Sequence, residues 1–297
     1  MDEDRRTRTI APLPAPGRLS ILAPGSAIGE RFAVLRVLGS GGWSVVYLAE
    51  DRELGRRVAL KVLRADRLSD AAVTRFRREV AIARDASSPH LVRIYDLGTA
   101  GEAIYLSMEA IEGESLRQRL ARGPLPVAEA AEVARQVLLG LGELHRLGIV
   151  HRDVKPANVL LAAGGTVKLA DLGLARPFDR DATRATDTEA LVGTLDYLSP
   201  EQALGEEVGP ASDLYALGVV LYEMLAGELP HAAKTSLGTL IARVHRRSPD
   251  VRRRRPEVPA RLAALLRRLL DNDPAERATA ADALPLLARI AARPDRC

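Results

Sequence analysis

Residues 151–158 read His-Arg-Asp-Val-Lys-Pro-Ala-Asn and are the most informative stretch of the chain. Side chains of distinct polar chemistry stand together here between two apolar runs, residues 149–150 and 159–161. A second polar sequence, Asp171-Leu172-Gly173, directly follows residues 166–170, whose alternating pattern predicts a strand. A solvated loop of chance composition is the alternative interpretation, and this combination of residues in this order disfavours it.

The chemistry of these side chains fits the handling of a phosphate group. Asn158 and Asp171 offer amide and carboxylate oxygens, the hard ligands that suit Mg²⁺. Asp153 can accept or orient the proton of a hydroxyl group, and Lys155 can neutralise the charge of a phosphate during transfer. The sequence therefore predicts a metal pair and a catalytic pair in one neighbourhood.

A glycine-rich stretch near the start of the chain offers a second phosphate contact. Residues 39–45 read Gly-Ser-Gly-Gly-Trp-Ser-Val, and glycines let backbone N–H groups approach phosphate oxygens closely. By itself the pattern is equally compatible with an ordinary hairpin turn. A dinucleotide-binding turn would require a helix after the glycines. Here an apolar strand, residues 45–49, follows instead, which disfavours that alternative.

A lysine and a carboxylate follow in the next two predicted elements. Lys61 ends the sequence Val58-Ala59-Leu60-Lys61 on a predicted strand, residues 57–63, and can reach phosphates beneath the glycines. Such a lysine needs a carboxylate to hold it. Glu79 stands at the edge of the apolar face of a predicted helix over residues 70–85, so we expect it to point inward. A solvated lysine at a strand end is the simpler alternative.

The elements predicted along the chain form two parts. Strands and one helix occupy the first part, and helices dominate after Gly113. The strands are expected at residues 32–38, 45–49, 57–63, 92–97 and 104–109, and the later helices at 127–147, 213–227, 259–271 and 280–292.

Composition excludes several classes of protein. With 297 residues, 47% of them hydrophobic, the chain is long enough for two domains or one bilobal unit. Its single cysteine, Cys297, excludes a disulfide framework and a cysteine-built zinc site. The net charge of +4 is too small to indicate nucleic-acid binding, and the only basic run, residues 252–255, reads as a solvated loop. No apolar stretch is long enough for a signal peptide or a membrane span, so we expect a cytoplasmic protein.

Taken together, the motifs resemble those of protein kinases, in particular the eukaryotic-like Ser/Thr kinases of bacteria. The resemblance covers about residues 30–292. Asp213 and Arg277 also stand where the family has a buried helix aspartate and the arginine partner of Glu201. Six motifs occur in the family's order: residues 39–45, residues 58–61, Glu79, residues 151–158, residues 171–173 and Ser199-Pro200-Glu201.

The resemblance implies an α+β, bilobal kinase-like fold. The small lobe would hold a five-stranded antiparallel sheet and one main helix, and the larger lobe would be mainly helical. The implied parts are a flexible proline-rich tail (1–28), an N-lobe (29–109), a C-lobe (110–292) with the hinge at 109–114 and the activation loop at 171–201, and a C-terminal tail (293–297).

The resemblance also implies where ATP and its metals would bind. Lys61, paired with Glu79, would contact the α- and β-phosphates, and Asn158 and Asp171 would hold Mg²⁺, for which Mn²⁺ could substitute. Asp153 would orient the acceptor hydroxyl and Lys155 would assist it. The nucleotide would further contact Leu38, Gly39, Ser40, Gly41, Gly42, Val46, Ala59, Met108, Glu109, Ile111 and Leu160.

The implied acceptor is a Ser or Thr hydroxyl of a protein substrate. Lys155, two residues after Asp153, and Thr194 match the Ser/Thr kinase pattern, with Thr194 positioning the substrate. Thr186 and Thr188 are candidate autophosphorylation sites whose phosphates could pair with Arg152, and self-association could support phosphorylation in trans. The alternatives are an ATP-binding scaffold without transferase activity and a small-molecule phosphotransferase on the same fold. Neither nucleic acid nor a membrane span is expected.

Overall fold

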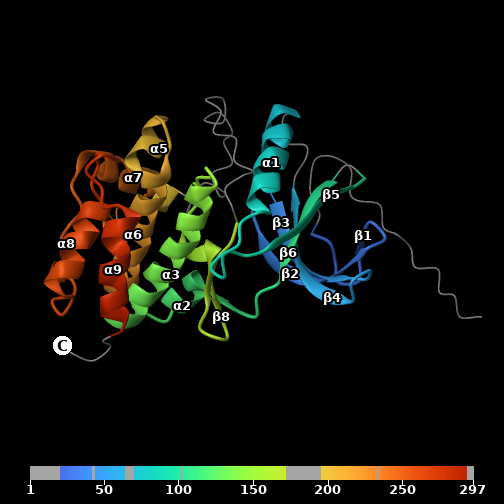
Figure 1. The fold of residues 1–297 in the computed structure, drawn as a ribbon, viewed down its shortest axis with the longest axis horizontal. Coiled ribbons are helices and arrows are strands. Elements are labelled where there is room, and N and C mark those ends of the chain that lie inside the picture. Colours follow the sequence, from blue (N-terminus) through green and yellow to red (C-terminus); the bar gives the residue numbers. More distant parts are fainter. Residues whose placement is uncertain are drawn as a thin grey trace, which may run out of the picture. The chain divides into compact units, whose positions relative to one another are not determined.

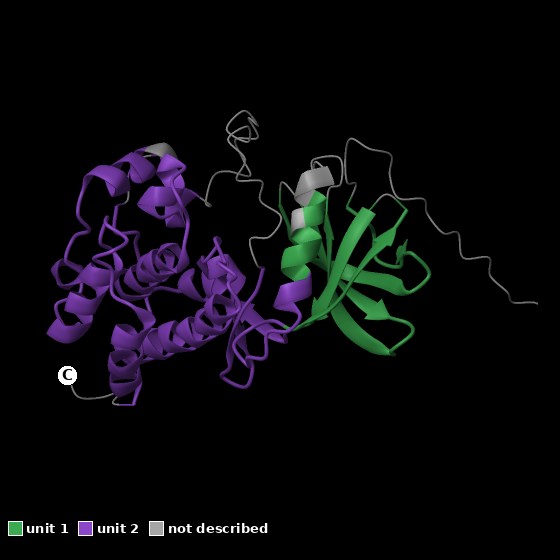
Figure 2. Ribbon diagram, turned by 45° about the horizontal axis from the view of Figure 1, so that its top comes forward, with its two compact units in different colours: residues 1–80, 93–110 green, residues 81–92, 111–297 purple. Residues whose placement is uncertain are grey.

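The computed structural model of the protein describes residues 21–41, 44–63, 70–101, 103–171, 195–231, 233 and 235–292. The chain divides into two compact units, shown in Figure 2. Unit 1 comprises residues 1–80 and 93–110, and unit 2 comprises residues 81–92 and 111–297. The sequence placed residues 81–92 in the first part. They group with unit 2 because Ser87 donates a backbone hydrogen bond to Glu143 and Leu91 pairs with Leu169.

A six-stranded antiparallel sheet forms the body of unit 1 (Figure 1). Side chains alternate between buried and half-buried or exposed along Ser44–Asp51, the pattern of a strand with one face in the core. The core includes Phe32, Tyr47 and Leu60. In sheet order the strands are β1 (Ala27–Ile28), β2 (Phe32–Ser40), β3 (Ser44–Asp51), β4 (Arg56–Leu63), β6 (Ala103–Glu109) and β5 (Ile94–Ala100).

The expected count of five strands was one too low, because residues 21–28 join the fold. Leu22 and Ile28 are buried in the core of unit 1, and β1 pairs with β2. The backbone N–H of Leu22 also donates to the Tyr47 hydroxyl at 3.2 Å. Assigning residues 21–28 to the tail therefore differs from the structure. The sequence did not indicate this, because the segment is rich in proline and its two buried apolar residues, Leu22 and Ile28, are too far apart to show a period.

Helix α1 (Asp70–Ala83) confirms the helical period seen in the sequence. Phe76 and Val80 are buried, whereas Arg77 and Arg78 are exposed, as expected. Glu79 lies between these two faces and is half-buried.

Unit 2 is mainly helical and adds a small sheet with the order β7-β8-β9. This arrangement and the sheet of unit 1 confirm the α+β class. The small strands are β7 (Gly113–Ser115), β8 (Val159–Ala162) and β9 (Val167–Leu169). The helices are α2 (Leu116–Leu120), α3 (Val127–Arg146), α5 (Pro200–Leu204), α6 (Pro210–Ala226), α7 (Ser236–His245), α8 (Ala260–Leu269) and α9 (Ala280–Ala291).

Helix α6 is the central helix of unit 2 and is buried almost all round. It packs against α3 and α8. A Cβ atom on Gly218 would lie 3.0 Å from the Cβ of Leu269, so glycine lets α6 and α8 approach closely. Within the described part of the chain, no helix is long and apolar enough to span a membrane.

Candidate active site

A buried carboxylate holds the loop that carries Asp153. Asp213, only 1% exposed near the start of α6, accepts the backbone N–H groups of His151 and Arg152, each at 2.8 Å. Arg152 has a φ of 64°, a left-handed conformation that is strained for a non-glycine residue. The two hydrogen bonds compensate this strain and fix the direction in which the loop leaves Arg152. His145 adds a third contact, with Nε2 2.8 Å from Asp213.

His151 connects this loop to the end of β9. Its ring is fully buried, and burial lowers the pKa of the imidazole, which favours the neutral form. The Asp153 N–H donates to Nδ1 at 3.2 Å, so Nε2 carries the proton and donates to the Ala170 carbonyl at 3.1 Å. A neutral His151 thus ties Asp153 to the residue before Asp171 without adding charge.

Asp153, Lys155 and Asn158 come together in the structure. The Asn158 amide donates to the backbone carbonyl of Asp153 at 2.8 Å and to its carboxylate at 3.0 Å. The ammonium group of Lys155 lies 3.0 Å from the same carboxylate. These contacts hold the Asp153 carboxylate beside a cation and an amide, an arrangement able to orient a hydroxyl group and stabilise the charge of a phosphate.

Asp171 directly follows Ala170, whose backbone is hydrogen-bonded to Asn158. The Ala170 N–H donates to the Asn158 carbonyl at 2.8 Å. The backbone of the next residue, Asp171, has a left-handed φ of 63°. Because the Asn158 amide nitrogen is directed at Asp153, its side-chain oxygen is the atom left for a cation. A carboxylate and an amide oxygen from neighbouring backbone segments are a donor set that fits Mg²⁺.

Unit 1 presents the predicted phosphate and adenine contacts on its sheet. Gly39, Val46 and Lys61 are directly opposite one another on β2, β3 and β4 and therefore share one face. Ala59 lies two residues before Lys61 on that face and is opposite Met108 on β6. Lys61 is 8% exposed, so most of this residue is shielded from solvent.

The remaining predicted nucleotide contacts differ in their surroundings. Leu38 is 43% exposed, and the Gly41 N–H donates to Ser44, which closes the glycine-rich turn. The Glu109 N–H donates to the carbonyl of Arg93 at 2.9 Å within unit 1. Ile111 and Leu160 belong to unit 2, and Ser40 ends β2. Gly42, Thr186, Thr188 and Thr194 lie outside the described residues.

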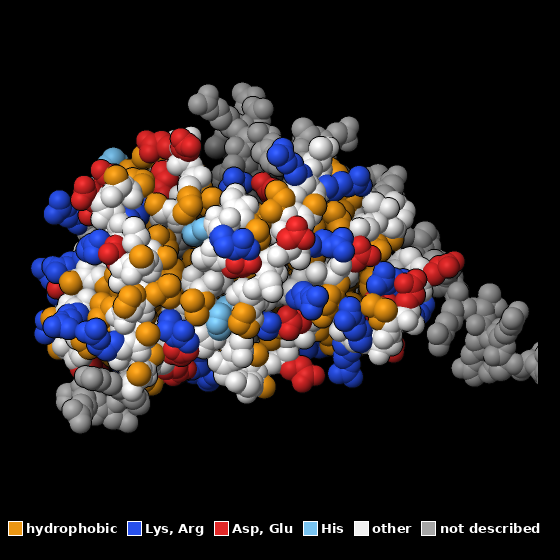
Figure 3. Space-filling model, viewed as in Figure 1, with side chains coloured by type: hydrophobic (Ala, Val, Ile, Leu, Met, Phe, Trp, Pro, Cys, Tyr) orange, Lys and Arg blue, Asp and Glu red, His pale blue; other side chains and the backbone are white. Residues whose placement is uncertain are grey.

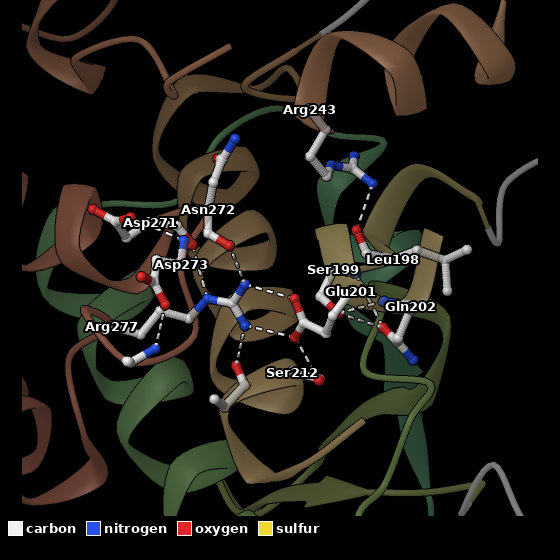
Figure 4. Close-up of polar contacts among 12 residues, drawn as sticks. Leu198, Ser199, Glu201, Gln202, Ser212, Arg243, Asp271, Asn272, Asp273 and Arg277 are labelled. Carbon is white, nitrogen blue, oxygen red and sulfur yellow. Dashed lines mark hydrogen bonds and ion pairs between the residues drawn. The ribbon is translucent and has the colours of Figure 1, made fainter. Parts of the chain in front are cut away.

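The predicted partnership of Glu201 and Arg277 is confirmed. Their side chains, 3% and 1% exposed, form two contacts of 2.7 Å, as Figure 4 shows. Burial would raise the pKa of Glu201, but hydrogen bonds from Arg277 and Ser212 outweigh it and lower the pKa to about 2. This buried ion pair holds α5 against the segment before α9, and hydrogen bonds of Glu201 with Ser212 and of Arg277 with Ala211 connect the pair to the start of α6.

Sequence reasoning missed the residues that position the loop and the segment before α5. Gln202 donates to the Arg152 carbonyl at 3.1 Å and caps α5 together with Ser199. The spacing of Ser199 and Gln202 is a capping-box signal that could have revealed this helix start. Arg243 and Glu223, which contact residues 195–198, gave no local signal.

The basic run at residues 252–255 is partly structural. The Arg255 guanidinium donates to the carbonyls of Leu125 and Leu225, and Arg254 pairs with Glu228. Figure 3 shows basic side chains gathered near the α8 end, with acidic side chains among them. The prediction of a solvated loop is therefore wrong for Arg255, whose side chain binds backbone carbonyls of unit 2.

Comparison with known proteins agrees with this geometry. A family model described as "Protein kinase domain" matches residues 32–286. The chain belongs to the protein kinase family.

Its relatives include serine/threonine-protein kinases of bacteria. PrkC of Bacillus subtilis is 38% identical over 255 residues, which are 85% of this chain and 39% of PrkC. Pkn2 of Myxococcus xanthus is 40% identical over 272 residues, 89% of this chain and 33% of the relative. PknB of Mycobacterium leprae is 39% identical over 270 residues, which are 89% of this chain and 43% of the relative. The chain thus spans less than half the length of these relatives.

Proposed function

We propose that this chain is a serine/threonine protein kinase that transfers the γ-phosphate of ATP to Ser or Thr hydroxyls of protein substrates. The observation that carries the proposal is the Asp153 carboxylate, held by Asn158 at 3.0 Å and Lys155 at 3.0 Å on a strained, anchored loop. Positioning and charge neutralisation supply most of the acceleration in phosphoryl transfer, and this arrangement provides both.

In the proposed reaction each group has a separate role. Asp153 orients the acceptor hydroxyl and accepts its proton, and Lys155 stabilises the charge on the transferred phosphate. Lys61, on the same sheet face as Gly39 and Val46, contacts the α- and β-phosphates and pairs with Glu79.

Further residues of the chain would contact the nucleotide. Val46, Ala59 and Met108 would contact adenine, together with Leu160 and backbone groups of Glu109 and Ile111. Leu38, Gly39, Ser40, Gly41 and Gly42 would cover the phosphates.

The site fits a divalent cation as cofactor. Asn158 and Asp171 would hold Mg²⁺, with Mn²⁺ as a substitute. When bound, the cation would neutralise charge on the ATP phosphates.

The proposed acceptor is a Ser or Thr hydroxyl, and the proposed regulation is phosphorylation of the chain itself. The contact between Lys155 and Asp153 supports Ser/Thr rather than Tyr as acceptor, and we expect Thr194 to help position it. We expect activation by phosphorylation of Thr186 and Thr188, in trans between self-associating copies in the cytoplasm.

Phosphate transfer from labelled ATP to myelin basic protein tests the proposal. Asp153→Asn keeps the shape of the side chain and removes the base, so we expect turnover to fall by about 10²–10⁴-fold while ATP binding is retained. Asp85→Asn, an exposed carboxylate of unit 2, is the matched control and should retain full turnover. Absence of phosphoserine and phosphothreonine with the unaltered protein would refute kinase activity, and full turnover of Asp153→Asn would refute the assigned base.

A further inference from the structure

Arg243 is a fully buried arginine on α7 whose role no sequence motif indicated. Its guanidinium donates to the carbonyls of Leu195 and Leu198, each at 2.9 Å, and also to the carbonyl of Asp196. Figure 4 shows the guanidinium directed at Leu198, just before α5. One side chain therefore binds three carbonyls of a single stretch, residues 195–198.

This contact depends on the shape of arginine. A guanidinium is planar, always charged and carries its five N–H donors in a rigid fork, so it can fix the directions of several carbonyls at once. Lys at the same position would keep the charge but present one flexible ammonium group. Residues 195–197 form a 3-10 turn, and the carbonyls that Arg243 binds are groups that such a short turn cannot satisfy by itself.

The stretch at residues 195–198 is held from two further directions. The Tyr197 hydroxyl donates to Glu223 of α6 at 2.7 Å. At its other end the stretch continues into Ser199 and Gln202, and Gln202 donates to the Arg152 carbonyl. Residues 195–198 therefore connect α7 to the loop that carries Asp153.

The environment of Arg243 argues against a role limited to stability. Burial lowers the pKa of its guanidinium, the direction expected for a charge taken out of water. Within the described part of the chain, the Arg243 Nε and the buried Tyr215 hydroxyl have no hydrogen-bond partner. Buried charges and unsatisfied donors are weak means of stabilising a fold, and apolar side chains of similar size serve that purpose better. Fixing a particular backbone conformation accounts for the arginine.

We infer that Arg243 is a positioning residue for the protein substrate. It fixes residues 195–198, which lead into the Gln202 contact with the Asp153 loop, and so sets where the acceptor lies relative to Asp153. The inference rests on the proposed kinase function, and it adds a residue that acts on the acceptor and not on ATP.

Arg243→Lys tests the inference with Arg255→Lys as matched control. Arg255 also binds two backbone carbonyls through its guanidinium, but at Leu125 and Leu225, away from residues 195–198. Steady-state kinetics with myelin basic protein and ATP should show the KM for the protein acceptor raised about 10–100-fold in Arg243→Lys, the effect of a small misplacement of the reacting groups. The KM for ATP should stay close to that of the unaltered protein, and Arg255→Lys should change neither KM.

Amide hydrogen exchange of the same proteins, without any substrate, provides the second measurement. Exchange at residues 196–198 should be faster in Arg243→Lys than in the unaltered protein and unchanged in Arg255→Lys. Unchanged exchange together with an unchanged acceptor KM, or equal changes in both KM values, would overturn the inference. If the unaltered protein transfers no phosphate, the proposed function fails, while the exchange result still decides whether Arg243 fixes this stretch.

Discussion

Replacing Glu201 by Gln should destabilise unit 2 strongly, because it leaves a buried arginine without its counter-charge. Glu201 and Arg277 are almost fully buried and make two hydrogen bonds of 2.7 Å. Removing one partner of such a pair costs about 3–5 kcal/mol. Arg277 would retain contacts with the carbonyls of Ala211, Asp271 and Asn272, which places the expected loss near the lower limit.

The pKa of Glu201 gives an independent value for the same loss. Folding lowers it from 4.5 to about 2. At 1.36 kcal/mol per pKa unit this shift corresponds to roughly 3 kcal/mol, in agreement with the first estimate. For a protein of this size we expect the melting temperature to fall by about 6–12 °C.

Urea unfolding followed by far-ultraviolet circular dichroism measures the loss. Because the folded pKa is lowered, the Glu201 contribution is complete above about pH 4.5 and is lost as the pH falls toward about 2. The stability difference between the unaltered protein and Glu201→Gln should therefore shrink over that interval. Glu114→Gln, which breaks an exposed pair with Arg122, is the control and should change stability little. Equal losses in the two variants at neutral pH would refute the reasoning.

Two further predictions concern the anchors of the loop and of the N-terminal segment. Two oxygens of Asp213 accept the N–H groups of His151 and Arg152, and Asp213→Asn replaces one of them by an amide donor. Turnover should fall about 10²-fold because the loop is misplaced. The affinity for ATP, measured by calorimetry, should stay the same. Normal turnover would contradict the role of Asp213. Leu22→Ala should lower the free energy of unfolding by about 2–3 kcal/mol, measured by thermal melting, because Leu22 is buried in the core of unit 1. A loss near zero would show that residues 21–28 contribute nothing to folding.

The elements with long periodic patterns could be predicted from the sequence. The strand at residues 44–51 and the helix at 127–146 each bury one face, so period and structure coincide. Short elements were missed, because their stability comes from capping and distant contacts. Helix α5 has only five residues and depends on the Ser199 cap and on Arg277.

For the candidate site, the sequence predicted the reactive groups, and among the groups that hold them the resemblance to the kinase family indicated Asp213. Asp153, Lys155 and Asn158 were recognisable from their chemistry and order, since they lie within six residues of one another. The groups that orient them come from far along the chain. Asp213 is 62 positions from His151, and Arg243 is 48 positions from Leu195. Such pairings arise when helices pack. Asp213 was therefore expected only from the family resemblance, and no pattern of residues indicated Arg243.

Helix α6 fixes the positions of the loop that carries Asp153 and of residues 195–198 relative to each other. Its sequence is almost entirely apolar and buried, yet it carries Ser212, Asp213 and Glu223. Asp213 holds the Asp153 loop, Ser212 donates to Glu201, and Glu223 accepts the Tyr197 hydroxyl, with burial raising the pKa of Glu223. Two buried polar residues, Ser212 and Asp213, and a half-buried Glu223 in one helix would be a poor choice for stability alone. Each of these side chains is instead hydrogen-bonded to a different segment of the site. Because α6 cannot rotate without exposing its apolar side chains, it fixes the positions of these three segments.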